Sequence, residues 1–297
     1  MLWKRVLTAL VGLPILILIL RNVEPVVYPL FSILVGISVY ELMSMLLPKL
    51  VKSFSGQLLN STSFKKWAFF AAIFATISFF SNRYFGLLGY LNPSYTSTFL
   101  ILLLIPCLLA LFGKEISMSF ALGVSFIISF VYGVLPWHFI LRFYEIPFLK
   151  NSTTPADLSL IYLLLLVVWG GDTGAYFGGR FLGKRKLAPT ISPKKTIEGA
   201  VCGLLASVLF ALGLNAIYSH FYEPIAPWSV ILVMAIVGSI FGQLGDLVES
   251  MFKRFSEVKD SGTLFPGHGG LLDRVDAVFF AAPAMWCVFE IMVGTIK

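Results

Sequence analysis

Runs of about 20 apolar residues recur along the chain, and they constrain its fold more than any other feature. A helix of that length crosses the roughly 30 Å hydrocarbon core of a bilayer. Of the 297 residues, 58% are hydrophobic and only 12% are charged, whereas a typical soluble domain has about 25% charged residues. These properties exclude an ordinary soluble domain and predict an integral membrane protein with the lipid bilayer as its surroundings.

The positions of the apolar runs predict an all-α membrane protein with about nine transmembrane helices. We expect them at residues 6–22, 25–47, 67–82, 96–113, 116–135, 157–178, 197–219, 226–250 and 271–295. The first run follows Lys4 and Arg5 as a signal peptide would, but no small-residue cleavage pattern comes after it, so we expect a retained helix.

The basic residues predict the orientation of these helices. With a cytosolic N-terminus, 17 of the 22 Lys and Arg residues fall in inside segments and 5 in outside segments. Such a bias is the positive-inside pattern of membrane proteins. The net charge of +7 therefore reflects topology, and we expect no nucleic-acid partner.

Ionisable residues divide the chain into two predicted regions. Residues 1–150 are expected to form a transmembrane scaffold and residues 151–297 a catalytic region, because charges enter the spans from about residue 165 onward. A charge within a span is costly and indicates function. Alternating topology brings five carboxylates to one depth near the cytosolic ends of the last four helices: Asp172, Glu198, Asp246, Asp273 and Asp276.

Three of these carboxylates are candidate metal ligands. Asp273 and Asp276 are three residues apart and share one helix face. Asp246 can join them if the last two spans pack side by side. Three converging carboxylates repel one another unless a cation neutralises them, and Mg²⁺ prefers oxygen ligands. The alternative is ordinary pairing with basic neighbours such as Lys253, Lys259 or Arg274.

Five glycines surround Asp172 in the segment 169–179, which reads WGGDTGAYFGG. Glycines let two helices approach closely. Helix packing alone would explain the glycines, but it does not explain the carboxylate. We therefore expect a polar site beside a closely packed helix.

The segment 192–199, which reads SPKKTIEG, is expected to begin a helix. Ser192 would cap it and Pro193 would stand at its start. Lys194 and Lys195 at a helix N-terminus would bind phosphate. The alternative is that both lysines only mark the cytosolic side.

The most specific segment is the 27 residues from Ser250 to Asp276, here called the signature segment. It contains a basic loop, a Pro-Gly turn around His268 and an acidic helix start. Backbone N–H groups in such turns can cradle phosphate, and Lys and Arg add cationic donors.

The signature segment resembles that of the phosphatidate cytidylyltransferase (CDP-diacylglycerol synthase) family. The segments around Asp172 and around Lys194 are similar to the other polar blocks of that family, so the resemblance covers about residues 165–297. It implies condensation of CTP with phosphatidic acid to give CDP-diacylglycerol and pyrophosphate. The implied mechanism is in-line attack of the lipid phosphate on the CTP α-phosphorus.

The resemblance also implies roles for individual residues. Asp246, Asp273 and Asp276 would bind Mg²⁺, with a second cation such as K⁺. Seven residues would bind substrate phosphates: Lys194, Lys195, Lys253, Arg254, Lys259, His268 and Arg274. The residues expected to act in catalysis, as metal support, nucleotide contact or loop support, are Asp172, Glu198, Lys194, Lys259 and Asp260.

The setting and the alternatives complete the prediction. We expect a homodimer in a bacterial inner membrane, with the active site facing the cytosol and a lateral opening toward lipid. One alternative is a CTP-dependent polyprenol kinase-like phosphotransferase, which would release CDP. Another is a non-enzymatic transporter, which buried charges would suit, although the charges gather at one face and no inverted repeat is evident.

Overall fold

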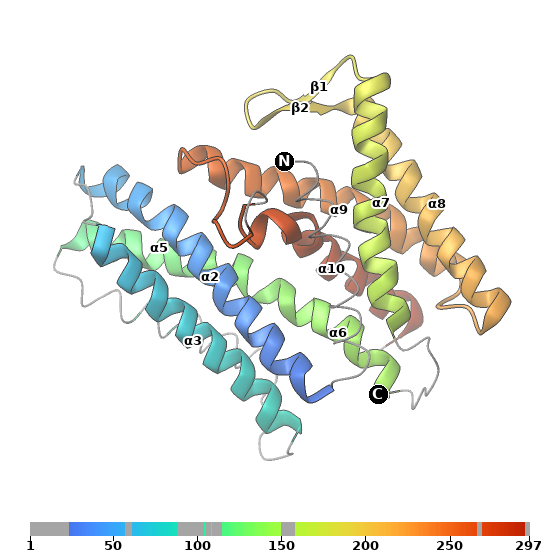
Figure 1. Cartoon of the computed structure of the whole chain (residues 1–297), viewed down its shortest axis with the longest axis horizontal. Helices are drawn as coiled ribbons and strands as arrows, with labels where there is room; N and C mark the ends of the chain where they lie inside the picture. Colours follow the sequence, from blue (N-terminus) through green and yellow to red (C-terminus); the bar gives the residue numbers. More distant parts are fainter. Residues whose placement is uncertain are drawn as a thin grey trace. The chain divides into compact units, whose positions relative to one another are not determined.

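The computed structural model describes residues 24–56, 61–87, 104, 108, 115–149, 158–265 and 269–294. These residues form helices and one two-stranded antiparallel hairpin (Figure 1). They fall into two compact units. Unit 1 holds the described residues of 1–137 and 252–274, and unit 2 holds those of 138–251 and 275–297.

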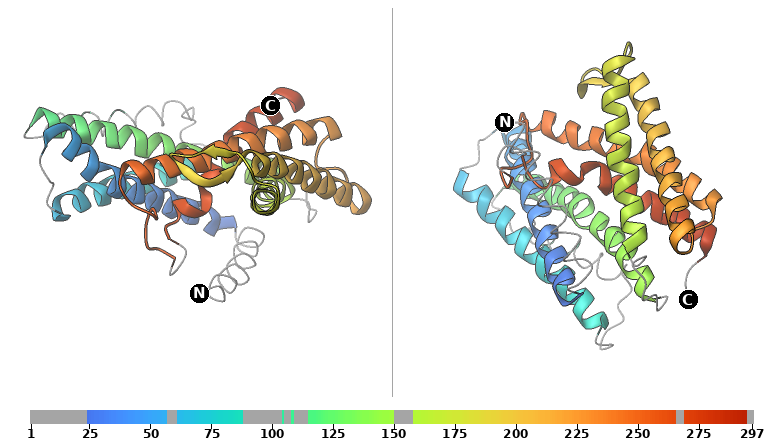
Figure 2. Two further views of the ribbon diagram at one scale, coloured as in Figure 1. Left: turned by 90° about the horizontal axis from the view of Figure 1, so that it is seen from above. Right: turned by 45° about the vertical axis from the view of Figure 1, so that its right-hand side comes forward.

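Unit 1 is built around helix α2 (Glu24–Ser55), which packs on α3 (Ser61–Leu87) and α5 (Ile116–Gly133). Figures 1 and 2 show α2 and α3 running side by side in opposite directions. At Gly36 the two helices meet closely, because a Cβ there would lie 2.1 Å from Thr76 Oγ1 and 3.2 Å from the carbonyl oxygen of Ala72. Glycine is therefore what permits this helix contact.

Unit 2 contains most of α6 (Leu135–Leu149), α7 (Ser159–Phe181), strands β1 (Lys186–Ala188) and β2 (Ser192–Thr196), and α8 (Ile197–Phe221). Most of α9 (Trp228–Phe255) and α10 (Leu272–Val293) completes it, while the end of α9 and the start of α10 belong to unit 1. Figure 1 shows α7 and α8 side by side, with the hairpin beyond their ends. The α9–α10 loop is residues 256–271.

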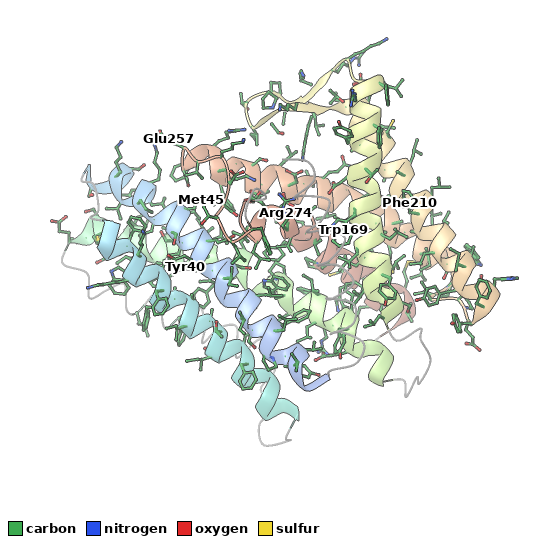
Figure 3. The ribbon with its side chains drawn as sticks, in the orientation of Figure 1. Tyr40, Met45, Trp169, Phe210, Glu257 and Arg274 are labelled. Carbon is green, nitrogen blue, oxygen red and sulfur yellow. The ribbon has the colours of Figure 1, made fainter. Side chains whose placement is uncertain are left out.

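Small residues allow α7 and α8 to pack closely, as the glycines predict. A Cβ on Gly174 would lie 2.4 Å from Ala206 Cβ, and one on Gly178 would lie 2.3 Å from Cys202 Cβ. The ring of Phe210, labelled in Figure 3, leaves no room for a Cβ on Gly170. Close backbone approach through small residues is a common way for membrane helices to associate.

The prediction of a mostly helical membrane protein is confirmed. Six helical segments of the described chain are long and apolar enough to cross a membrane: Val26–Ser55, Ile116–Glu145, Ser159–Phe181, Ile197–Phe221, Trp228–Phe255 and Leu272–Val293. Each overlaps one expected span. The expected span 67–82 lies in α3, which is helical but not among the six. The spans at 6–22 and 96–113 lie largely outside the described residues, so nine spans, like the cytosolic N-terminus, stay a prediction.

Helix α6 was not predicted, because the segment after residue 135 was expected to be a connection between two spans. Its first residues bury Trp137, whose ring nitrogen donates to Ser38 Oγ at 3.0 Å within unit 1. Further along, Phe143 packs edge-on against Trp286 in unit 2, with ring centroids 5.6 Å apart. Trp137, Leu141 and Tyr144 are buried at the spacing of one helix face, the pattern expected of a packed helix.

The hairpin corrects both the all-α prediction and the expected start of the helix at residues 192–193. Ser192 and Pro193 lie in β2, which pairs with β1 in antiparallel fashion. Helix α8 begins only at Ile197, and its cap is Thr196, whose hydroxyl accepts from the N–H of Gly199 at 3.1 Å. The cap has extended backbone angles, as N-cap residues typically do, so the strand continues directly into the helix start.

Replacing Gly174 with leucine should destabilise unit 2, because the new side chain would overlap Ala206 and Cys202. Overpacking of this kind costs about 1–3 kcal/mol, or an apparent melting temperature lower by about 4–10 °C, measured in detergent. Gly213→Leu is the matched control, since nothing lies within 4 Å of a Cβ at that position of α8. Equal shifts in both variants would contradict the packing role.

Candidate functional site

The carboxylate of Asp273 organises the start of α10 in unit 1. Its Oδ2 accepts hydrogen bonds from the N–H of Ser261 at 2.8 Å, from the N–H of Gly270 at 2.8 Å and from the Ser261 hydroxyl at 3.0 Å. Its Oδ1 accepts from Lys253 Nζ at 2.7 Å. Both oxygens are thus engaged, and the contacts join the end of α9, the α9–α10 loop and the first turn of α10.

A second carboxylate, Glu41 of α2, holds the same loop from the opposite end of the sequence. Glu41 is 5% exposed. Its Oε1 accepts from the N–H of Leu271 at 2.9 Å, and its Oε2 accepts from the N–H of Leu272 at 3.0 Å. The Ser261 hydroxyl lies 3.0 Å from Oε2 as well. Backbone N–H groups at a helix start lack acceptors within the helix. Glu41 provides these acceptors, and its negative charge is favourable at a helix N-terminus.

These two carboxylates explain three glycines of the signature segment. A Cβ on Gly262 would lie 2.6 Å from Glu41 Oε1, and one on Gly270 would lie 2.4 Å from Glu41 Oε2. Gly269 has φ = +83°, and a Cβ there would lie 2.4 Å from Asp273 Oδ2. The glycines therefore let the loop backbone come within hydrogen-bonding distance of the carboxylates. We call Glu41, Lys253, Ser261 and Asp273 the Glu41–Asp273 cluster.

The ion pair of this cluster is largely shielded from solvent, with side chains 15% exposed for Lys253 and 7% for Asp273. Removing one partner of a buried ion pair is strongly destabilising, because it leaves the other charge uncompensated. Lys253 is therefore both an expected phosphate ligand and a structural partner of Asp273.

A separate charged cluster lies in unit 2, where Lys195 of β2 pairs with Asp246 of α9 at 2.7 Å. Ser250 Oγ lies 3.3 Å from Asp246 Oδ1. Asp172 of α7 is within electrostatic range of both Lys195 and Asp246. We call Asp172, Lys195 and Asp246 the Lys195 cluster; it places two carboxylates near one ammonium group.

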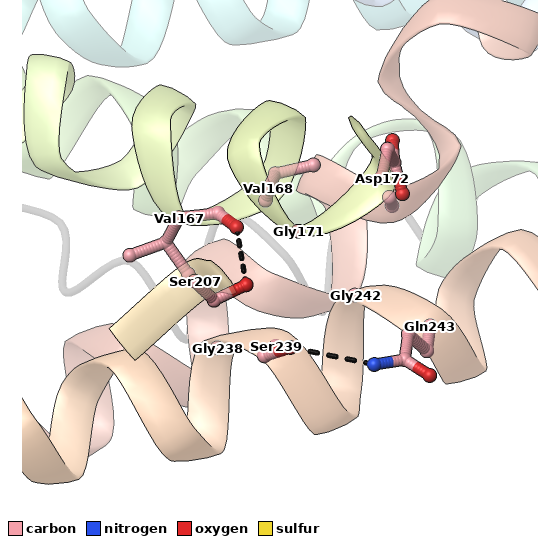
Figure 4. Close-up of a pocket in the computed structure, with 10 residues that line it drawn as sticks. Val167, Val168, Gly171, Asp172, Ser207, Gly238, Ser239, Gly242 and Gln243 are labelled. Atoms are coloured by element: carbon pink, nitrogen blue, oxygen red, sulfur yellow. Dashed lines mark hydrogen bonds between the residues drawn. The ribbon is translucent and has the colours of Figure 1, made fainter. Parts of the chain in front are cut away.

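A small cavity beside Asp172 is drawn in Figure 4. Its volume is about 10 Å³, close to the space that one water molecule needs. Gly171, Ser207 and Gln243 also line it. Ser207 donates to the carbonyl oxygen of Val167 at 2.7 Å, and Gln243 donates to that of Ala200 at 3.2 Å. Polar side chains thus link α7, α8 and α9 next to the Lys195 cluster.

Glu198 supports the hairpin in this structure. Its carboxylate accepts from the N–H of Lys184 at 2.9 Å and from the N–H of Arg185 at 3.1 Å. These contacts join the first turn of α8 to the chain entering β1. The carboxylate therefore holds the first strand of the hairpin, and Lys194 and Lys195 lie on the second strand, which pairs with it.

The remaining predicted residues lie around the two clusters. Lys194 is exposed on β2, Lys259 and Asp260 are exposed in the α9–α10 loop, and Arg254 and Arg274 are exposed on α9 and α10. Asp276 is partly buried, and its Oδ1 accepts from the N–H of Ala277 at 2.8 Å. His268 lies outside the described residues.

The three expected metal ligands are divided between the units. Asp273 belongs to unit 1, whereas Asp246 and Asp276 belong to unit 2. Within the described part of the chain, no three His, Cys, Asp or Glu side chains form a metal-binding group. Carboxylate oxygens are nevertheless the donors that a hard cation prefers. Asp172 and Asp246 lie near one ammonium group, that of Lys195, so two carboxylates share a single positive charge. The metal site stays a prediction.

Glu41 is the residue that the sequence prediction missed. It was assigned to the scaffold region, yet it binds the signature segment directly. A signal was present, since Glu41 is the one charged residue between Val26 and Pro48 in an otherwise apolar run. A charge in such a run indicates function or a specific partner. Its partner, 230 residues away, was not readable from spacing.

The fold and the clusters together define a multi-pass membrane protein with two lysine–carboxylate clusters, one in each unit. Residues 3–292 match the sequence model of the cytidylyltransferase family. The chain therefore belongs to the cytidylyltransferase family.

Individual relatives agree with this assignment. The chain is 51% identical over 134 residues to a phosphatidate cytidylyltransferase of Staphylococcus saprophyticus, 45% of this chain and 50% of the relative. It is 46% identical over 129 residues to one of Bacillus subtilis, 43% of this chain and 46% of the relative. It is 46% identical over 134 residues to one of Staphylococcus aureus, again 45% and 50%. The chain thus spans about half the length of the relatives it matches.

Replacing Glu41 with alanine should both destabilise unit 1 and remove activity. The N–H groups of Leu271 and Leu272 would lose a charged acceptor, at a cost of about 3 kcal/mol or more in total. The measurements are the melting temperature in detergent and turnover. Glu257→Ala is the control, because Glu257 is an exposed partner of Lys49 and surface pairs contribute little. A Glu41→Ala variant as stable and active as the Glu257→Ala control would contradict the assignment.

The Lys49–Glu257 pair of unit 1 should also respond to pH. The hydrogen bond from Lys49, and then its charge, lower the pKa of the Glu257 carboxyl. A lowered folded-state pKa stabilises the fold above the unfolded pKa, and this contribution disappears as pH falls through the folded value. Since Glu257 is exposed, this contribution should be small. The melting temperature of the Glu257→Ala variant should therefore lie slightly below that of the unchanged protein at pH 7, and the difference should vanish at acidic pH.

Replacing Lys195 with alanine should reduce kcat/KM about 30-fold or more. It removes one charged hydrogen bond donor and leaves Asp246 without its cation. Lys186→Ala provides the comparison, because Lys186 is an exposed residue of the neighbouring strand β1. Steady-state kinetics should show less than a twofold effect at Lys186, and similar losses at both positions would argue that only overall charge matters.

Proposed function

We propose that this protein is a phosphatidate cytidylyltransferase, which joins CTP and phosphatidic acid to give CDP-diacylglycerol and pyrophosphate in phospholipid biosynthesis. The observation that carries the proposal is the family match over residues 3–292, together with relatives of that name. The engagement of the signature segment by Glu41 and Asp273 supports it, because hydrogen bonds hold described residues on both sides of the Pro-Gly turn.

In the proposed reaction, an oxygen of the lipid phosphate attacks the α-phosphorus of CTP. A new bond forms between that oxygen and the α-phosphorus, and the bond from the α-phosphorus to the bridging oxygen of the β-phosphate breaks. Pyrophosphate leaves with the electron pair. The attacking phosphate monoester is already largely ionised at pH 7, so the reaction needs no general base.

Neutralisation of charge is then the main catalytic requirement, because both substrates are anions. Lys195 and Lys253 are held by Asp246 and Asp273, which keeps their ammonium groups in place. Preorganised cations stabilise the charge that develops in a transition state more effectively than mobile ones. We propose that Lys194, Lys259, Arg254, Arg274 and His268 add further phosphate contacts.

Asp246, Asp273 and Asp276 would hold Mg²⁺, with Asp172 in support and a second cation such as K⁺ nearby. A bound Mg²⁺ would neutralise phosphate oxygens and orient them. Asp260 would support the α9–α10 loop, and Glu198 would position the hairpin lysines through its contacts with Lys184 and Arg185.

The proposed setting follows the charge distribution of the sequence. We propose a bacterial inner-membrane protein that acts as a homodimer, with its site open to the cytosol for CTP and to the inner leaflet for phosphatidic acid. The excess of basic residues in the expected inside segments supports this orientation.

The function is tested by incubating the purified protein with labelled CTP, phosphatidic acid and Mg²⁺. We expect label in a lipid product together with pyrophosphate, and loss of both on chelation. Asp276→Asn should lower turnover at least about 100-fold in protein that still elutes as a folded species. Asp273→Asn should lower turnover to the same extent and also lower the melting temperature, because it leaves the buried Lys253 without its charged partner. Release of CDP would indicate a polyprenol kinase-like transfer, and full activity of either Asn variant would refute the metal assignment.

A further inference from the structure

An open groove of about 640 Å³ lies within unit 1, between α2, α3 and the α9–α10 loop. None of the roles described above uses it. The loop contributes Ser261, Gly262, Thr263 and Leu264 to one part of the wall. The groove therefore adjoins the signature segment through the same residues that contact Glu41.

The face of α2 that lines the groove changes character along its length. Ile33 and Ile37 come first, followed by Tyr40, Glu41 and Ser44. These residues share one helix face, and the stretch from Ile33 to Ser44 spans about 16 Å. Tyr40 is labelled on α2 in Figure 3. The groove thus has an apolar end and a polar end, and the polar end is the one beside the α9–α10 loop.

Helix α3 supplies the opposite wall, which is almost entirely apolar. Phe69, Ile73 and Ile77 are 62%, 43% and 59% exposed, although all three line the groove. Since Thr76 lies against Gly36, Ile77 is near the Ile33 end. If α3 crosses the bilayer as the expected span 67–82 predicts, these exposed apolar side chains contact acyl chains.

We propose that this groove binds an acyl chain of the phosphatidic acid substrate, with the glycerol and phosphate at the Glu41 end and the chain running toward Ile33 and Ile77. The inference rests on the proposed function and adds a lipid subsite to it. The two ends of the groove match the two ends of the lipid. The hydroxyls of Tyr40, Ser44 and Thr263, which line the groove, suit the ester groups. The phosphate would lie beyond the lining, toward Lys253, whose partner Asp273 contacts the groove residue Ser261.

The groove contributes orientation and not hydrophobic free energy, because a chain that leaves the bilayer for the groove exchanges one apolar environment for another. Holding the chain places the phosphate beside the loop, and correct placement of reacting groups is worth large factors in rate. Two backbone N–H groups donate to the Glu41 oxygens, which offsets part of the repulsion between this carboxylate and a phosphate.

The test fills the apolar end of the groove with the double variant Ile33→Trp/Ile77→Trp. We expect kcat/KM for dioleoyl phosphatidic acid to fall about tenfold or more, while kcat/KM for dihexanoyl phosphatidic acid and the KM for CTP change less than twofold. Short chains should not reach the filled end. The matched control is Ile127→Trp/Val131→Trp, at two exposed aliphatic positions of α5 outside the groove. Equal losses with both lipids, or losses equal to the control, would overturn the proposal.

A binding measurement separates failure of the subsite from failure of the proposed function. Phosphatidic acid with a diazirine at the chain end is crosslinked in detergent without CTP, and the labelled peptides are mapped. The proposal is supported if residues 33–44 and 69–77 are labelled and unlabelled phosphatidic acid reduces this labelling, whereas phosphatidylcholine with the same acyl chains does not. Equal competition by phosphatidylcholine indicates bulk lipid and overturns it. Absence of cytidylyl transfer with any lipid would refute the enzyme alone, since the crosslinking needs no turnover.

Discussion

Two carboxylates hold the start of α10, and the arrangement of unit 1 depends on them. Glu41 accepts the N–H groups of Leu271 and Leu272, and Asp273 accepts those of Ser261 and Gly270. Backbone N–H groups that are buried away from water must find partners within the protein. Here the carboxylates of the signature segment and of α2 are these partners, and Lys253 balances part of the resulting negative charge.

This arrangement gives structural contacts to the same residues for which catalytic roles are proposed. Asp273 is an expected metal ligand, but in this structure its oxygens bind Lys253 and the loop. Asp246 is similarly paired with Lys195 in unit 2. Buried carboxylates without such partners would be costly in a low-dielectric setting. Each lysine is therefore kept beside a carboxylate, which fixes the position of its ammonium group.

Much of the fold was predictable because apolar length and charge placement are local properties of a chain. The spans around α7, α8 and α10 were predicted within a few residues, whereas α2 and α9 continue to Ser55 and Phe255, beyond their expected ends at residues 47 and 250. The hairpin was not, because Pro193 and Ser192 suit a helix start as well as a strand, and the pairing of Lys186 with Thr196 decided between them. Helix α6 was missed because its buried aromatic residues only make sense beside partners such as Ser38 and Trp286.

The sequence by itself determined the membrane class, the helical character and the family resemblance, since these depend on composition, run length and a contiguous 27-residue segment. Only the tertiary structure decided which residues complete that segment. Glu41 lies more than 200 residues before Ser261 and Leu271, and no periodicity links them. Long-range hydrogen bonds arise when helices pack, so the role of α2 in holding the signature segment became visible only in the folded chain.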